Sequence, residues 1–100
     1  MPDDFDEAIK ALAHPMRRQI LQWLKDPQAN FPEQHHSLDD GVCAGQIHQK
    51  SELSGSTASA HLAVLHKAGL VHRKKVGQWH FFSRNEQAIT ALLSDIRNQI

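Results

Sequence analysis

The feature that most constrains the fold is a helix pattern between Ser54 and Gly69. Ala58, Leu62 and Leu65 recur at helical spacing, and Gly69 stands where the apolar series stops. Serine is a residue type that caps helix N-termini, and glycine is the type that most often ends helices. The stretch therefore predicts an amphipathic helix whose apolar face must pack against other elements.

Two short segments rich in β-branched and aromatic residues follow this helix, at 70–76 and 79–84. Gly77 and Gln78 separate them, which is the length and composition of a tight hairpin turn. The hairpin is predicted to be basic, with Arg84 at its far end. Its expected core side chains are Trp79, Phe81 and Phe82.

A shorter helix is predicted upstream, at about 44–50, with Ile47 facing inward and residues 51–54 as the connecting turn. Two helices joined by a tight turn form a helix-turn-helix, which lies here at about 44–68. The hairpin at about 70–84 is then the wing of a winged helix-turn-helix, a fold that binds DNA.

The remaining segments add three more elements. Apolar residues at helical spacing predict helices at about 4–13 and 15–25, the second with Pro15 as its first residue. Residues 26–41 contain two prolines and few apolar side chains, which predicts a loop. A last helix is predicted at 85–100. The fold class is therefore mainly α with a small β-hairpin (α+β), with about five helices.

Composition limits the class of protein. With 40% hydrophobic and 22% charged residues, the stretch 1–100 is expected to form a single globular domain. No apolar run approaches the ~18–20 residues needed to cross a bilayer, and the acidic start differs from a secretory signal. The only cysteine, Cys43, cannot form an internal disulfide. We therefore expect a cytoplasmic protein without a membrane partner.

The net charge of zero hides a segregation of charge along the chain. The start of the first predicted helix is acidic, whereas residues 41–84 contain six basic residues and one acid, Glu52. Three of these bases are consecutive, from Arg73 to Lys75, on the first strand of the wing. A basic surface on a neutral protein attracts a polyanion to one face, so double-stranded DNA is the expected partner.

The second helix of the helix-turn-helix offers small polar side chains for this contact. In the major groove its N-terminal residues would reach the base edges, while a basic wing contributes salt-sensitive affinity. His61 is consistent either with a groove contact or with bracing the helix packing. His66, His72 and His80 are interpreted as surface or wing residues. The predicted DNA-binding residues are Gly55, Ser56, Thr57, Ser59, Ala60, His61, Arg73, Lys74, Lys75 and Gln78.

Four segments resemble the ArsR (arsenical-resistance-type) family of winged helix-turn-helix repressors. They are LAHPMRRQIL (12–21), VCAGQI (42–47), LSGSTASAHLAVLHKAGLV (53–71) and RKKVGQWHFFS (73–83). The resemblance implies a homodimer built from the first and last helices. Such a dimer represses a promoter, at an operator expected to be an imperfect palindrome, until an inducer releases it.

The last predicted helix carries an apolar stripe that little of the remaining chain is left to cover. A contiguous exposed apolar face usually marks an interface, in agreement with the implied dimer. The expected dimerisation helices are about 4–13 and 85–100. The predicted interface residues are Phe5, Ile9, Leu12, Ile89, Leu92, Leu93 and Ile96.

Many members of that family sense thiophilic metals, yet both standard sites are incomplete in this sequence. The cysteine pair at the start of the third helix is reduced to Cys43. The last helix, where other members hold zinc with Asp, His and Glu, has no histidine and only Glu86 and Asp95 as acids. Soft-metal sites generally have three or four ligands. We therefore expect no metal and no cofactor. The alternative site that residue types allow combines Cys43, His48, His35 and His36.

Other functions stay open at this point. Cys43, near a helix N-terminus, is either a small packing residue or a redox-sensitive thiol without a resolving partner in the chain. A winged-helix interaction module that does not bind DNA is a further alternative, against which the basic wing argues. No pattern supplies a base and an oxyanion site for a thiol enzyme, so no enzymatic activity is expected. The inducer is not predicted.

Overall fold

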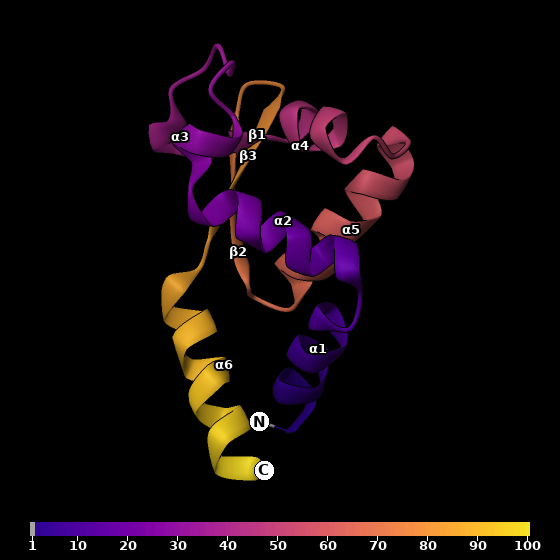
Figure 1. Ribbon diagram of the computed structural model, residues 1–100, viewed down its shortest axis with the longest axis vertical. Coiled ribbons are helices and arrows are strands. Elements are labelled where there is room, and N and C mark those ends of the chain that lie inside the picture. Colours follow the sequence, from indigo (N-terminus) through magenta and orange to yellow (C-terminus); the bar gives the residue numbers. More distant parts are fainter. Residues whose placement is uncertain (1) are drawn as a thin grey trace.

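The computed structural model describes residues 2–100, with side chains from residue 4 onward. Six α-helices, one 3-10 helix and three strands follow one another in this part of the chain (Figure 1). No helix within it is long and apolar enough to span a bilayer. In chain order the elements are α1 (Pro2–Leu12), α2 (Pro15–Lys25), α3 (Pro27–Asn30), η1 (Leu38–Asp40), β1 (Val42–Cys43), α4 (Ala44–Ser51), α5 (Gly55–Lys67), β2 (Val71–Val76), β3 (Trp79–Arg84) and α6 (Glu86–Gln99).

The predicted winged helix-turn-helix is confirmed, with α4 and α5 as the two helices and β2 and β3 as the wing. Its core lies between α2, α4, α5 and the base of the sheet. Ile20, Ile47 and Leu65 are fully buried there, and Phe82 contributes from β3. Burying a side chain of this size stabilises the fold by roughly 1.5–3 kcal/mol. The predicted apolar stripe of α5 is therefore its packing face.

The predicted helix ends are confirmed at three positions. Pro15 begins α2, and Nδ1 of His14 caps this helix by accepting a backbone N–H at 3.0 Å. Ser54 caps α5 through its Oγ, which accepts the backbone N–H of Thr57 at 3.2 Å. Gly69 has a φ of +79°, the left-handed conformation in which glycine ends helices.

The hairpin is part of a three-stranded antiparallel sheet with the order β1-β3-β2. The additional strand, β1, pairs Val42 with Phe82 and Cys43 with Phe81. A strand of two residues has no periodicity, which is why the sequence indicated only two strands. Because β1 leads directly into α4, it joins the start of the helix-turn-helix to the wing.

The segment 26–41, predicted to be a loop, contains α3 and η1. Pro27, one of the two prolines on which that prediction was based, occupies the first turn of α3, where a helix needs no backbone donor. Gln34 then holds the later part of the segment. Its Nε2 donates to the carbonyl of Gly41 at 3.1 Å, and its Oε1 accepts the backbone N–H of Cys43 at 2.8 Å.

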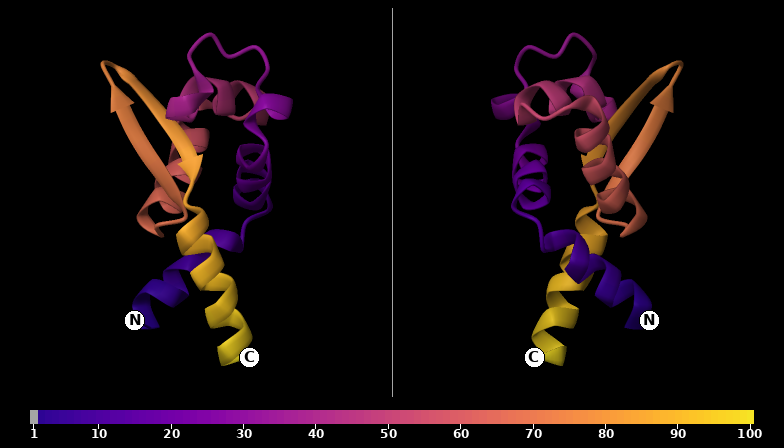
Figure 2. Two further views of the ribbon diagram at one scale, coloured as in Figure 1. Left: turned by 90° about the vertical axis from the view of Figure 1, so that its left-hand side faces the viewer. Right: turned by 90° about the vertical axis from the view of Figure 1, so that its right-hand side faces the viewer.

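The terminal helices α1 and α6 extend together from the end of the molecule opposite the tip of the wing (Figure 2). Of the seven predicted interface residues, Leu92 is buried, whereas Ile9 and Leu93 are 37% and 60% exposed. The other four pack partly against the core: Phe5, Leu12, Ile89 and Ile96. The dimer stays a prediction, and these helices offer apolar surface for it.

Arg17, near the start of α2, connects the end of α1 to α5. Its Nε and Nη2 donate to the carbonyls of Ala11 and Lys10 at 2.7 and 3.1 Å, and its Nη1 lies 3.3 Å from Nδ1 of His61. A guanidinium only donates, so Nδ1 of His61 must carry a lone pair. The ring of His14 also lies against His61, with centroids 4.4 Å apart. His61 therefore braces α5 in its neutral form.

Protonation of His61 should make the stability of the fold depend on pH. Burial, followed by the charges of His14 and Arg17, lowers the pKa of His61 below its usual 6.5. In the unfolded chain the pKa returns to this usual value, so the unfolded state takes up the proton first as the pH falls. The free energy of unfolding should therefore decline as the pH falls below 6.5 toward the lowered pKa, and this contribution should be constant well above 6.5.

Urea unfolding at about pH 7.5 and about pH 5.5 measures this effect. The decline should be smaller in His61→Gln than in the wild type. His72→Gln, at an exposed position of the wing, should keep the wild-type decline. Equal declines in the wild type and in His61→Gln would show that this histidine does not brace the junction in its neutral form.

Candidate nucleic-acid interface

The turn between α4 and α5 sets the direction in which α5 leaves the core. Glu52 has a left-handed backbone conformation, with a φ of +60°, directly after α4. Oγ of Ser51 donates to the carbonyl of His48 at 2.8 Å and accepts the backbone N–H of Leu53 at 3.2 Å. Local hydrogen bonds therefore define the turn, and α5 begins at its end.

The exposed surface of α5 consists of small and polar side chains. Ser56, Thr57, Ser59 and Ala60 are all exposed. The hydroxyl of Thr57 accepts a hydrogen bond from Ser54 at 2.8 Å, which leaves its own proton free to donate outward. α5 contains no acidic residue, and its N-terminus carries the positive end of the helix dipole. This surface can therefore approach a polyanion closely and donate hydrogen bonds to it.

Gly55 and His61, also predicted to bind DNA, lie at the edges of this surface. A Cβ at Gly55 would lie 3.3 Å from Cε1 of His48, so a small residue lets α4 and α5 approach each other. His61 is partly buried and is engaged by Arg17. Its bracing contact is thus present in the fold, and a contact of His61 with DNA stays a prediction.

The strand register divides the wing (β2 and β3) into two faces. In an antiparallel pair, partners lie on the same face and successive residues alternate between faces. Arg73 pairs with Phe82, and Lys75 pairs with His80. Arg73, His80 and Phe82 line a hollow together with residues of α5. This face of the wing, which also carries Lys75, is therefore turned toward α5.

The segment after α3 covers the opposite face of the wing. Nζ of Lys74 lies 2.6 Å from Oδ1 of Asp40, and the ring of His36 lies 5.1 Å from Trp79 and 5.2 Å from Phe81. Sequence reasoning missed Asp40 and His36 because neither belongs to a motif that connects it to the wing. The alternation of the strand, by contrast, could have separated Lys74 from its two basic neighbours.

Two wing residues differ from expectation. Trp79 is 45% exposed and is not part of the hairpin core, whereas both wing phenylalanines are buried. The side chain of Arg84 is 15% exposed. Its Nε donates to Glu86 at 2.7 Å, its Nη1 donates to the carbonyl of Leu21 at 3.1 Å, and the first of these bonds lowers the pKa of Glu86. Arg84 therefore secures the base of the wing and does not extend its basic surface.

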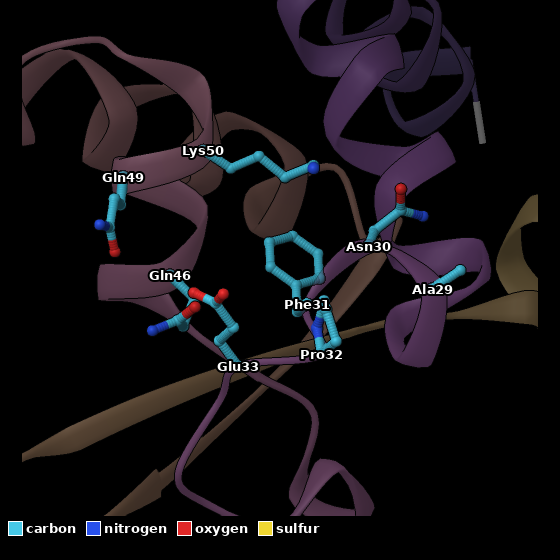
Figure 3. A pocket seen from close by; sticks show the side chains of 8 residues that line it. All are labelled: Ala29, Asn30, Phe31, Pro32, Glu33, Gln46, Gln49 and Lys50. Atoms are coloured by element: carbon cyan, nitrogen blue, oxygen red, sulfur yellow. The ribbon is translucent and has the colours of Figure 1, made fainter.

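Lys50 lies beside a hollow of about 340 Å³ between α4 and the residues at the end of α3 (Figure 3). Its Nζ lies 5.4 Å from the ring centroid of Trp23 and 5.8 Å from that of Phe31. A cation over aromatic faces is stabilised by the charge distribution of the rings. Lys50 therefore has a role within the fold.

Four of the six basic residues between 41 and 84 are thus engaged within the chain. Lys50 stacks on aromatic rings, Lys67 lies 3.7 Å from Glu7, and Lys74 and Arg84 have carboxylate partners. Within residues 2–100, Arg73 and Lys75 have no such partner. The fold therefore leaves two unpaired bases, both on the face of the wing that is turned toward α5.

The candidate metal ligands are not assembled into a site. Cys43, His35 and His36 border one hollow of about 280 Å³, while His48 lies against Gly55. No group of three or more His, Cys, Asp or Glu side chains in the described part of the chain is placed to hold a metal ion. The four-residue alternative is therefore not formed in this conformation. Cys43 is 7% exposed, as expected for a packing residue.

Comparison with known sequences identifies the helix-turn-helix directly. Residues 40–73 match the family described as "Bacterial regulatory protein, arsR family". The chain is 39% identical over 97 residues to YbzH of Bacillus subtilis, an uncharacterised HTH-type transcriptional regulator, and the match covers 94% of this chain and 96% of the relative. It is 32% identical over 85 residues to the transcriptional activator HlyU of Vibrio cholerae, which covers 85% and 67% of the two chains.

Solved structures agree with this assignment. A crystal structure of an ArsR family transcriptional regulator superimposes with a TM-score of 0.76 over 99% of this chain and 89% of its own, at 17% identity, which establishes the fold alone. The structure of HlyU from Vibrio cholerae gives 0.64 at 28% identity, over 96% and 91% of the two chains. The chain therefore belongs to the ArsR family of helix-turn-helix transcriptional regulators, as its sequence motifs indicated.

Proposed function

We propose that this regulator is a homodimeric repressor that binds an imperfect palindrome in double-stranded DNA. The observation that carries the proposal is that Arg73 lines a hollow with Ser59 of α5, and that Lys75 lies on the same face of the wing. Both bases lack a partner among the described residues and face the helix. With α5 in the major groove, the wing would reach the adjacent backbone or minor groove.

Within this interface α5 would supply the sequence preference. Ser56, Thr57 and Ala60 lie on its exposed surface near the N-terminus, where a recognition helix meets the base edges. Hydroxyls bond several bases, and small side chains permit close approach. Gly55 precedes these residues, Ser59 lies among them, and Gln78 lies at the exposed tip of the wing.

Ser56→Ala should change which DNA sequences are preferred. The loss of one base contact should reduce discrimination at one base pair of each half-site by roughly 1 kcal/mol, with a smaller effect on non-specific binding. Selection from a random duplex library, followed by affinity measurement, tests this. Ser94→Ala, the same change on the exposed surface of α6, is the control. An unaltered preference in Ser56→Ala would remove this residue from the recognition surface.

Arg73→Ala and Lys75→Ala should each weaken binding to every duplex. Each change removes about one phosphate contact, so the slope of log K against log salt should become less steep by about 0.9. Lys74→Ala, from the same strand, should cost less because Asp40 already pairs with this lysine on the other face. Fluorescence anisotropy at several salt concentrations measures all three. A loss in Lys74→Ala that exceeds the other two would mean that the opposite face of the wing meets DNA.

The dimer would form through α1 and α6. Leu93 and Ile9 are exposed apolar residues on these helices, at the end of the molecule away from the wing. A two-fold axis there would place two copies of α5 side by side, so that they could enter successive major grooves about one helical turn, ~10 base pairs, apart. The palindromic form of the operator follows from this symmetry.

Leu93→Glu should shift the dimer toward monomer, because it places a charge where two apolar helices would meet. Sedimentation velocity across a concentration series should show an increase in the dissociation constant of at least about tenfold. Gln87→Glu adds the same charge at an exposed polar position of α6 and should leave the equilibrium unchanged. If Leu93→Glu dimerises as the wild type does, the interface lies elsewhere.

Repression is the simpler mode of action, because a dimer bound over a promoter blocks polymerase without a further contact surface. A relative that is 36% identical over 63 residues, from Halobacterium salinarum, is named a putative arsenical resistance operon repressor. HlyU, in contrast, is named an activator. In vitro transcription from a promoter that carries the selected operator distinguishes the two: the protein should lower transcript yield, and a rise would establish activation.

A further inference from the structure

A pocket of about 160 Å³ lies between α5 and the wing. Ser59 and His66 border it from α5, and Arg73 and His80 border it from the wing, above an apolar floor that includes Leu62 and Phe82. We refer to it as the helix–wing pocket. Its residues come from α4, α5 and both wing strands, and α5 and the wing lie side by side at the base of the wing (Figure 2).

The polar residues of this pocket suit an anion. Arg73 carries a permanent positive charge, the two imidazoles can donate hydrogen bonds or accept a proton, and Ser59 has a hydroxyl. None of the described residues that line the pocket carries a carboxylate. Nδ1 of His80 is buried and has no hydrogen-bond partner among the described residues. Because no protein acceptor holds Nδ1, this imidazole can adapt its tautomer or charge to a bound oxyanion.

The position of the pocket matches that of one DNA group. If α5 occupies the major groove and the wing approaches the adjacent minor groove, the sugar–phosphate backbone that separates the two grooves must pass between them. From this geometry, which rests on the proposed function, we infer that the helix–wing pocket receives a backbone phosphate. His66 and His80 then act as phosphate ligands beside Arg73, and the sequence had indicated them only as surface or wing residues.

This arrangement makes DNA affinity depend on pH. His66 faces the pocket from α5, and Arg73 and His80 face it from the wing. Lys75 lies on the same face of the wing, paired with His80 across the strands. The residue of α4 that lines the pocket, Ala44, is uncharged. Imidazoles gain a proton in mildly acidic solution, and each added charge strengthens phosphate binding. Affinity should therefore rise as the pH is lowered from about 8 to about 6.

The test compares the wild type with His66→Gln, His80→Gln and the double variant, which keep a polar side chain and lose the titrating group. His72→Gln is the matched control, since it lies on the other face of the same wing and is exposed. The probe is a duplex of arbitrary sequence, about 30 base pairs or three helical turns long, because phosphate contacts do not depend on sequence. Thermal unfolding of each variant confirms that it is folded.

At about pH 6 the double variant should bind the duplex about three- to tenfold more weakly than the wild type and with a less steep salt dependence. At about pH 8 the difference should largely vanish, and His72→Gln should follow the wild type at both values. If the double variant and His72→Gln behave alike at the lower pH while DNA is bound, the pocket holds no phosphate and the proposed function stands.

A second arm uses inorganic phosphate without DNA and follows the histidine ring signals by NMR. Shifts of His66 and His80, absent for His72 and abolished by Arg73→Ala, would support an oxyanion site. If these shifts occur while the wild type binds no duplex, the site takes free phosphate and the proposed DNA-binding function is wrong. If neither phosphate nor the duplex distinguishes these histidines from His72, the inference is wrong.

Discussion

The central strand β3 pairs with β1 on one side and with β2 on the other, and this pairing positions the helix-turn-helix and the wing relative to each other. Through β1, it ties the wing to the first residue of α4. Through β2, it sets which side chains face α5. Phe82 points into the core and Phe81 is buried on the other face, so the central strand is held from both sides. A slip of one residue in this register would exchange the two faces and turn Lys74 toward α5 in place of Arg73 and Lys75.

The unpaired positive charge of residues 41–84 is therefore more localised than the charge pattern of the sequence suggests. This segment of the sequence has six bases, and four of them have a carboxylate or an aromatic ring as a partner within the chain. The two that remain unpaired lie beside a helix without acidic residues. In the proposed interface, α5 would supply the sequence preference and these two bases would supply salt-sensitive affinity. The contact between Arg17 of α2 and His61 of α5 holds α5 against the N-terminal part of the fold.

Sequence patterns predicted the helix ends and the buried helix face correctly where a residue type has one common structural role. Ser54, Pro15 and Gly69 each stand where caps require them, and the apolar stripe of α5 is buried as expected. The predictions were wrong where a residue type occurs commonly in two different structural settings. Pro27 was one of the two prolines that predicted a loop, and instead it starts α3. Aromatic character predicted Trp79 in the hairpin core, although it lies near the tip of the wing, where the ring of His36 stacks on it.

Residue types at short, regular spacings were enough to predict the helix-turn-helix, the hairpin and the family, and to show that the family's usual metal ligands are incomplete. Tertiary structure alone decided which bases stay unpaired, how His66 and His80 come to share a pocket with Arg73, and that Asp40 reaches Lys74. Such pairs are separated by up to dozens of residues and follow no period, so only packing and strand register can bring them together. The capped helix at 54–69 could be predicted from the sequence. Which basic residues of the wing face this helix depends on the strand register and could not be predicted.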